Sequence, residues 1–385
     1  MKNPKVSIVI PYRQRLRNIR IAFEAFARQT LPRAEFEIVL GVMEHAPDFT
    51  ALCQEFSDRL DIVAVSCSYD WQVGRARNLA LRMARGSVVV LLDADMAVPR
   101  RFLENLWERH FAGGQEHCVV GQMIDYDNNT ADVTSAEARP YAFYADRLAE
   151  LDRHGPGPAD ARLRTAHVIA WAFAWTALIA LPRDTITRHD LFFDLNFHGY
   201  GVEDLEWAYR VSRAGVPIVM REDVFGIHLP HQRNVAANRR TEEANYRYFL
   251  GKWPSVEVEL AAAFGDFEAN QQLVAFRREL SEVLPSGSAG PAVVRGASAG
   301  VDTVVVGAGL GADGEVCLPV GTTFDAEPEV TVLPLAGLAL PFPTGSVQRC
   351  VISPSVRGFS TRYRKHILAE AGRVARETTD AAALT

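Results

Sequence analysis

Residues 87–96 read Ser-Val-Val-Val-Leu-Leu-Asp-Ala-Asp-Met, and this stretch decides the fold class. Its uncharged run of Val and Leu is typical of a strand that is buried on both faces of a parallel sheet. The run ends in two carboxylates, Asp93 and Asp95. Ligands of open α/β sheets bind just beyond the carboxyl ends of strands. Two acidic side chains there can hold a divalent cation, which in turn can hold phosphate oxygens; alternatively, they only cap the next helix.

The composition bounds the class of protein. The chain has 385 residues, of which 48% are hydrophobic, and a formal net charge of −6. This length predicts two or three domains, and the charge argues against a general nucleic-acid binder. We see no membrane span and no signal peptide, so we expect a cytoplasmic protein. The five cysteines have no paired spacing and are expected to be reduced.

Upstream of residue 87, short apolar strands alternate with amphipathic helices. This βαβαβ rhythm predicts an α/β fold with a mostly parallel sheet and right-handed crossovers. We expect Gly86 to stop the helix before residue 87. The expected strands are 6–10, 36–42 and 61–65, and the expected helices are 18–29, 49–59 and 71–86.

Four blocks occur in order over roughly the first 235 residues. They are Val-Ser-Ile-Val-Ile-Pro-Tyr-Arg at 6–13, Gly-Arg-Ala-Arg-Asn-Leu-Ala-Leu at 74–81, Leu-Leu-Asp-Ala-Asp at 91–95, and a segment at 193–215 that contains Gly-Tyr-Gly-Val-Glu-Asp. Together they resemble the nucleotide-sugar-binding half of a family 2 glycosyltransferase with the GT-A fold. The resemblance implies a sheet flanked by helices and a nucleotide-sugar donor.

The resemblance also implies where the nucleoside of the donor binds. It places the base against Pro11, Tyr12 and Arg13, with a solvated loop as the alternative for the last two. Members of the family often have an acidic pair after the second strand. Here only Glu44 stands nearby, which leaves the identity of the base open.

Further donor residues follow from the same resemblance. Arg77 and Asn78 match the family's Arg-Asn pair and are expected at the diphosphate or at the Asp-Ala-Asp loop. A solvated helix face is the alternative for the arginines at 75–82. Within the loop, Asp93 is expected to face the nucleoside, with Ala94 beside it, and Asp95 to bind Mn²⁺ or Mg²⁺.

A histidine completes the cation shell in many metal-dependent relatives. After a strand expected at 217–220, His228 is the candidate here and His231 its rival. Upstream, residues 171–183 are expected to form a strand whose alternation puts Trp171 and Trp175 on one face. We place Trp175 at the donor sugar and Trp171 at the acceptor, with core packing as the alternative for both.

The acceptor side centres on residues 199–204. Tyr200 and Gly201 are expected at the acceptor, ahead of a helix that begins near Glu203. An inverting transfer needs a carboxylate that takes the acceptor's proton. Asp204 is the candidate, and Glu203 is the alternative base or an acceptor ligand. Carboxylates in the first turn of a helix are also ordinary partners of the helix dipole.

The rest of the chain predicts further parts. We expect the glycosyltransferase domain at 1–235, a helical extension at 236–284, a linker at 285–300 and a small α/β module at 301–385, and a mobile loop at 153–160. Residues 301–311 and 340–353 weakly resemble a class I methyltransferase. The sequence between them is too short for a complete cofactor pocket. We therefore expect a truncated module that serves packing or association, including a homo-oligomer.

These observations lead to one expected function and one alternative. The expected function is a metal-dependent inverting glycosyltransferase that moves a sugar from a nucleotide sugar, with a UDP-sugar expected, to a hydroxyl or amine of a soluble acceptor. The alternative is a non-catalytic module on the same fold that binds a sugar nucleotide or a partner.

Overall fold

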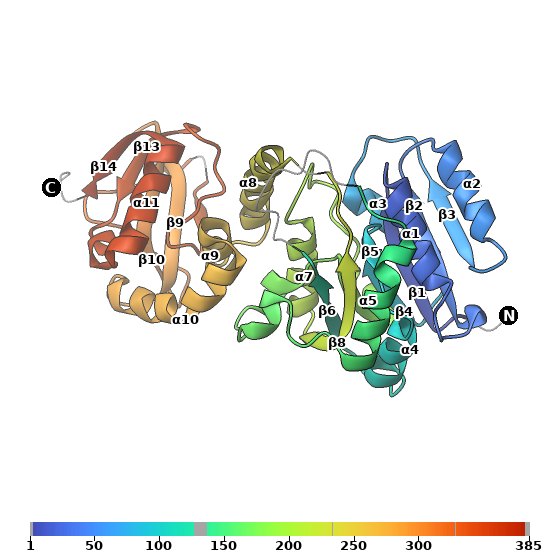
Figure 1. Ribbon diagram of the computed structural model, residues 1–385. Coiled ribbons are helices and arrows are strands. Elements are labelled where there is room, and N and C mark those ends of the chain that lie inside the picture. The colour runs from blue at the N-terminus through green and yellow to red at the C-terminus, as the bar shows by residue number, and fades with distance from the viewer. Residues whose placement is uncertain (1–2, 127–136, 233, 328, 382–385) are drawn as a thin grey trace. The chain divides into compact units, whose positions relative to one another are not determined.

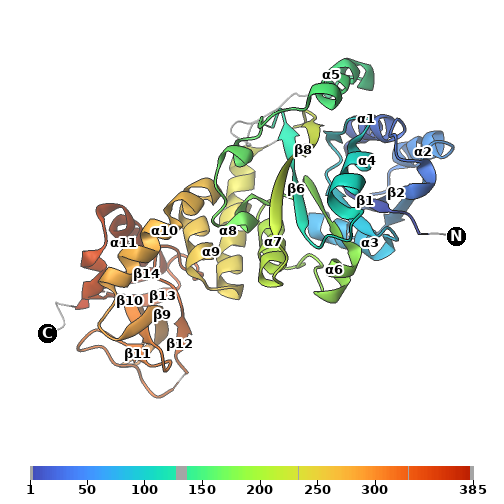
Figure 2. The same cartoon turned by 90° about the horizontal axis from the view of Figure 1, so that it is seen from below.

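The computed structural model describes residues 3–126, 137–232, 234–327 and 329–381. The chain divides into two compact units, Met1–Glu242 and Glu243–Thr385. Figures 1 and 2 label their helices and strands. None of the helices in the described ranges is both long and apolar enough to cross a lipid bilayer.

A mixed sheet forms the centre of the first unit. Over the described residues it has eight strands in the order β3-β2-β1-β4-β7-β6-β8-β5. The first four are parallel, β7 runs antiparallel to β4 and β6, and β6 is parallel to β8. The strands are β1 (Val6–Tyr12), β2 (Phe36–Val42), β3 (Ile62–Ser66), β4 (Val88–Leu92), β5 (Met96–Ala97), β6 (Cys118–Ile124), β7 (Leu178–Pro182) and β8 (Ile218–His228).

Helices cover both faces of this sheet. Right-handed crossovers from β1 to β2 to β3 put α1 and α2 on one face, and the return to β4 puts α3 on the other, as Figure 2 shows for α1 and α3. The helices are α1 (Leu16–Phe26), α2 (Pro47–Phe56), α3 (Val73–Met83), α4 (Phe102–Leu106), α5 (Tyr141–His154), α6 (Arg183–Arg188), α7 (Glu203–Arg213) and α8 (Val235–Lys252).

The predicted rhythm of strands and helices is confirmed, but Gly86 does not stop a helix. Helix α3 ends at Met83, and Ala84 after it is already extended. Gly86 instead lies against β1, where an added Cβ would be 2.5 Å from the backbone nitrogen of Ser7. Its N–H donates to the Ser7 hydroxyl, which itself donates to the buried Glu37. The glycine is therefore needed for close approach of the backbone.

The strand expected at 171–183 is much shorter than predicted. Residues Ala170–Phe173 form a 3₁₀ turn, and β7 begins only at Leu178. The alternation that we used to put Trp171 and Trp175 on one face therefore does not apply. Small residues interleaved with aromatic ones look like a strand in sequence, but a tight turn buries such rings equally well. In contrast, the strand expected at 217–220 is longer than predicted, because β8 extends to His228.

The second unit has its own sheet. Its described strands lie in the order β12-β9-β10-β13-β14, with β11 beside β10. Phe276 stacks on Phe359 and meets Tyr363 edge-on, which packs the helices together. The elements are α9 (Val256–Phe264), α10 (Asp266–Val283), β9 (Ser288–Ser298), β10 (Val301–Gly311), β11 (Val316–Cys317), β12 (Thr331–Leu333), β13 (Val347–Ile352), α11 (Thr361–Val374) and β14 (Ala375–Asp380).

Two local expectations for this unit are corrected. The segment 285–300, expected as a linker, contains β9, which pairs along β10. The glycines at 307–311, which weakly resemble the glycine loop of a methyltransferase, lie within β10 itself rather than in a turn before a helix. Ser and Gly in these strands are compatible with sheet pairing because β9 and β10 form a long antiparallel ribbon. The proposed division into functional domains stays a prediction.

Candidate functional site

Asp95 lies at the centre of a compact group of ionisable side chains. It follows β4, and the residue is 2% exposed. His231 Nδ1 lies 3.0 Å from Asp95 Oδ2, and His228 Nε2 lies 3.9 Å from Asp95 Oδ1. Pairing of Met96 in β5 with His228 in β8 brings these residues together. Arg15, in the loop after β1, forms an ion pair with the same carboxylate.

This group fits a divalent cation. One ligand atom from each of Asp95, His228 and His231 lies within 4.8 Å of the others. Among the residues that the structure describes, none donates a hydrogen bond to the buried Asp95 Oδ1, so this oxygen has lone pairs available to a ligand. One carboxylate and two imidazoles suit an ion such as Mn²⁺ better than Mg²⁺, which prefers oxygen ligands. Both histidines, rather than one of the two, fit the site.

Arg77 connects the Asp-Ala-Asp loop to the acidic pair of α7. Its side chain is 4% exposed. Nη2 donates to Asp93 Oδ1 at 3.1 Å, and Nη1 donates to Glu203 Oε1 at 2.9 Å. Burial alone would lower the pKa of Arg77, but Asp93, Glu203 and Asp204 raise it above its usual value. The guanidinium is therefore a permanent positive charge between the two motifs, and not a residue on a solvated face.

Asp204 has different surroundings from its neighbour Glu203. Its Oδ1 accepts the N–H of Leu205 at 2.9 Å and its Oδ2 accepts the N–H of Thr176 at 3.4 Å. Burial raises the pKa of Asp204 to about 7, and the charge of Glu203 acts in the same direction. Arg77 and the two backbone N–H groups oppose this rise. Asp204 is thus a carboxylate that can exchange a proton near neutral pH.

The residues expected to hold a base at the end of β1 are already engaged. The Tyr12 ring is 2% exposed and stacks on Phe49 with centroids 4.1 Å apart. Burial, and then the charge of Glu44, raise the pKa of Tyr12. Glu44 accepts the backbone N–H of Gln14 at 2.7 Å, which holds the loop after β1. Pro11 pairs with β2 and is buried.

Arg13 is exposed, and its partner is a residue that the sequence analysis missed. Its guanidinium carbon lies 5.8 Å from the centroid of the Trp71 ring. Trp71 immediately precedes Gln72, the N-cap of α3, and is partly exposed. The loop that holds Arg13 against Trp71 also holds Arg15 against Asp95. Trp71 is therefore a partly exposed aromatic ring beside this loop.

The other predicted residues lie around these two centres. Asn78 brackets Phe193 by donating to its carbonyl oxygen and accepting its N–H, both at 2.8 Å, so its amide supports the segment before α7. Ala94 is buried in the core cluster. Tyr200 is 43% exposed, and its backbone bonds to the Thr241 hydroxyl. Gly201 has φ 95°, as the turn before α7 requires.

The two tryptophans differ in burial. Trp171 is 2% exposed and meets Tyr209 edge-on at 5.4 Å, so it belongs to the packing under α7. Trp175 is partly exposed, and its ring lies 5.7 Å from that of Tyr126, which also lies 5.1 Å from His228. Trp175 therefore lies near the candidate metal ligand His228, whereas Trp171 packs against α7.

Three residues near the site carry no motif of their own. Arg15 could have been found from its place beyond β1, because the carboxyl ends of β1 and β4 meet at one edge of the sheet. Trp71 could have been found in the same way, from the end of β3. Tyr126 follows β6 in a polar stretch, and residues 127–131 of that stretch lie outside the described residues.

The chain is similar to known proteins over part of its length. Residues 7–166 match the sequence family described as Glycosyl transferase family 2. A validoxylamine A glucosyltransferase of Streptomyces hygroscopicus subsp. jinggangensis is 27% identical over 267 residues, which cover 67% of this chain and 63% of the relative. The chondroitin synthase of Pasteurella multocida is 23% identical, covering 56% of this chain and 23% of the relative. The chain thus spans less than two thirds of the length of these relatives.

Solved structures give more distant similarities. A mannosyltransferase from Pyrobaculum calidifontis, in complex with GDP-Man and Mn²⁺, is 17% identical with a TM-score of 0.48, covering 72% of this chain and 76% of the other. S. aureus TarS 1–349 in complex with UDP-GlcNAc is 14% identical with a TM-score of 0.46, covering 68% and 71%. The sequence match, rather than these similarities, supports the assignment. Residues 7–166 therefore match Glycosyl transferase family 2, as the sequence blocks at 74–81 and 91–95 within this range predict.

Proposed function

We propose that the protein transfers a sugar from a nucleotide sugar, with a UDP-sugar as the expected donor, to a hydroxyl or amine of a soluble acceptor, with inversion at the sugar carbon. The observation that carries this proposal is the position of Arg77. Its two hydrogen bonds join the Asp-Ala-Asp loop to the acidic pair that contains Asp204. Arg77 thereby links the loop that is suited to hold a diphosphate to the acidic pair that is suited to accept a proton.

The donor side of the proposal rests on Asp95 and its neighbours. Asp95, His228 and His231 would hold the divalent cation, which would supply positive charge to the leaving diphosphate. Asp93, held by Arg77, would face the nucleoside. Trp175 would lie against the donor sugar, because a ring of this kind packs well on the apolar side of a pyranose and this one is partly exposed.

The acceptor side rests on Asp204. As the acceptor oxygen or nitrogen attacks the sugar carbon, its proton would pass to Asp204 Oδ2 or Oδ1. The bond from the sugar carbon to the diphosphate oxygen breaks on the opposite face, and the nucleoside diphosphate leaves. Glu203 is less suited as the base because Arg77 already donates to its carboxylate. Such proton transfer contributes about 10²–10⁴-fold to a rate.

The relatives narrow the substrates only slightly. The Streptomyces relative is named for transfer of a glucosyl group to validoxylamine A. Its likeness to this chain favours a hexose donor and a small acceptor. The cytoplasmic location expected from the sequence stays a prediction.

Calorimetry of UDP binding tests this proposal. We expect the wild-type protein to bind UDP more tightly with Mn²⁺ than with a chelator. Asp95→Asn and His228→Ala should lose that dependence on the metal. The matched control is His154→Ala, because His154 is exposed at the end of α5. If no member of a panel of nucleotides binds with Mn²⁺ or Mg²⁺, the proposed function is wrong.

A further inference from the structure

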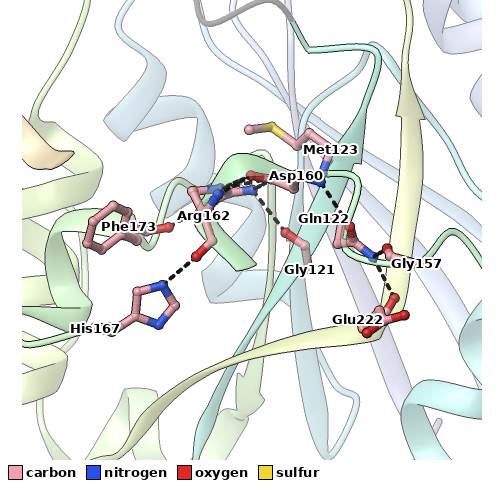
Figure 3. A network of polar contacts seen from close by, with 9 residues as sticks. All are labelled: Gly121, Gln122, Met123, Gly157, Asp160, Arg162, His167, Phe173 and Glu222. Atoms are coloured by element: carbon pink, nitrogen blue, oxygen red, sulfur yellow. Dashed lines mark hydrogen bonds and ion pairs between the residues drawn. The ribbon is translucent and has the colours of Figure 1, made fainter. Parts of the chain in front are cut away.

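Among the described residues, Arg162 is the most deeply buried arginine that the reaction described above does not use. It lies in a 3₁₀ turn, Ala161–Arg164, and is 1% exposed. A buried charge is costly unless it is paired and hydrogen-bonded. Its guanidinium donates to Asp160 and to the backbone carbonyl oxygens of Phe173 and Gly121, as Figure 3 shows. The reaction described above does not explain why this charge is buried.

Hydrogen bonds of the Arg162 guanidinium link three segments of the chain. Nη2 donates to Asp160 Oδ2 at 2.7 Å and to the carbonyl oxygen of Gly121, in β6, at 3.1 Å. Nη1 donates to the carbonyl oxygen of Phe173 at 2.8 Å. Asp160 in turn accepts the backbone N–H of Met123. The segment 153–160, which the sequence predicts to be a mobile loop, is thus anchored to β6 at its end.

The same guanidinium contacts the first of three neighbouring rings, the last of which belongs to the candidate metal ligand His228. Its carbon lies 4.4 Å from the centroid of the Trp175 ring. That ring packs on Tyr126, and Tyr126 packs on His228. The planar charge of an arginine can stack on an aromatic face while its edge donates hydrogen bonds, which a lysine cannot do.

Arg162 also fixes the segment that reaches the proposed base. Its bond to the Phe173 carbonyl and its contact with Trp175 hold residues 173–175. The next residue, Thr176, donates its N–H to Asp204. One side chain therefore holds both the ring at the sugar and the backbone group that contacts the base.

We propose that Arg162 is a positioning residue that sets the Trp175 ring and the hydrogen bond from Thr176 to Asp204 for sugar transfer. The proposal rests on the proposed function, because it assigns a role in that reaction. Arg162 is not itself placed at a substrate, and it acts through Trp175 and Thr176, which it positions. A purely structural anchor would affect only folding, and this difference can be measured.

The test compares Arg162→Met and Arg162→Lys with Arg164→Met. The control residue Arg164 lies in the same turn but is exposed. We expect Arg162→Met to lower kcat by at least about tenfold, because small misplacements at a reacting centre are costly, while UDP binding with Mn²⁺ is unchanged. Arg162→Lys keeps the charge beside Asp160 but cannot keep the whole set of contacts, so kcat should be intermediate.

A pH profile adds a readout that a folding role would not move. The Thr176 N–H favours the ionised form of Asp204, and Glu203 and Arg77 are the charged groups that face it. Loss of the Thr176 bond should therefore move the acid limb of kcat/KM to higher pH in Arg162→Met. If the Arg162→Met protein does not fold, we test the double variant Asp160→Asn with Arg162→Met instead. The double variant removes both buried charges.

A direct probe follows Trp175 without turnover. In protein labelled with 5-fluorotryptophan, with the resonance assigned by Trp175→Phe, we expect Arg162→Met to shift the Trp175 signal but not that of the buried Trp207. A folded Arg162→Met or Arg162→Lys protein with wild-type kcat and an unshifted acid limb would overturn this inference alone. Absence of turnover in the wild-type protein with every donor would instead overturn the proposed function.

Discussion

Glu203 and Asp204 are adjacent residues with different chemical roles, and the difference arises from their partners. Glu203 Oε1 accepts a hydrogen bond from the buried Arg77. Asp204 accepts the backbone N–H groups of Thr176 and Leu205 and lies beside the charge of Glu203. The pair thus joins a carboxylate bound by an arginine to a carboxylate that can gain a proton.

The raised pKa of Asp204 predicts the pH dependence of the reaction. A base must be ionised, so kcat/KM should fall as the pH drops below about 7, where Asp204 becomes protonated. Glu203→Gln removes a charge that raises the pKa, so the acid limb should move to lower pH. The control Asp184→Asn changes a carboxylate that is 83% exposed and should leave the profile unchanged. An identical acid limb in Glu203→Gln and wild type would contradict this account.

Trp71 is predicted to stack on the base of the donor, since Tyr12 is packed against Phe49. Stacking of a base on an aromatic ring is worth about 1–3 kcal/mol. Trp71→Ala should therefore weaken UDP binding by about 5- to 150-fold, as measured by calorimetry with Mn²⁺. It should leave the binding of inorganic diphosphate unchanged. Equal losses for both ligands would show that Trp71 only supports the loop.

At the scale of elements, backbone contacts position the site. Helix α3 packs on β1 and β2 and carries Arg77. The carbonyl oxygen of Ala76, the residue before Arg77, lies close to Gly41 of β2. Helix α7 is held by Trp207, which donates to the Leu191 carbonyl at 2.8 Å. The motif residues are therefore precise in position because the helices that carry them are tightly packed.

Gly41 tests this packing. A Cβ at Gly41 would lie 1.8 Å from the Ala76 carbonyl oxygen, so Gly41→Ala must push α3 away from β2. Overpacking of this kind destabilises a protein by about 1–3 kcal/mol or more, and displacement of Arg77 should also lower kcat. The contrasting variant is Gly372→Ala in α11, where nothing lies within 4 Å. Gly372→Ala should raise the free energy of unfolding by about 0.5–1 kcal/mol. If both variants unfold in urea as the wild type does, the packing argument is wrong.

Glu259 plays the corresponding part in the second unit. Its buried carboxylate in α9 accepts the N–H groups of Ala336, Gly337 and Leu338 at 2.6–2.9 Å. Each buried N–H left without an acceptor costs about 1–3 kcal/mol. Glu259→Ala should therefore lower the free energy of unfolding in urea by about 3 kcal/mol or more. Glu257→Ala, on the same helix with an ion pair at the surface, should cost at most about 1 kcal/mol, and equal losses would argue against the buried anchor.

At the scale of the whole molecule, every residue that we assign to the reaction lies in the first unit, Met1–Glu242. The family match ends at residue 166, but Asp204, His228 and His231 complete the candidate site from beyond it. The second unit has a separate sheet and core. Its expected role in packing or association, including a homo-oligomer, stays a prediction.

The sequence allowed the central strands and the positions of the motifs to be predicted, because each depends on a local pattern. The apolar run before Asp93 and Asp95 is read directly as a buried strand. In contrast, Arg15 and Trp71 approach the site only through the arrangement of β1 and β3, which no local pattern records. The strand at 171–183 was predicted too long because alternation does not distinguish a strand from a 3₁₀ turn. Gly86 was misread because close backbone approach depends on a distant strand.

The measurement that tests the central claim most directly is turnover and donor binding of Asp204→Asn beside the wild type, with Asp184→Asn as the control. With Mn²⁺ and a UDP-sugar that the wild type uses, Asp204→Asn should bind UDP as the wild type does, while its kcat falls by about 10²–10⁴-fold. Wild-type turnover in Asp204→Asn would contradict the account. So would a wild-type protein that binds nucleotide sugars but transfers no sugar, as a non-catalytic binding module would.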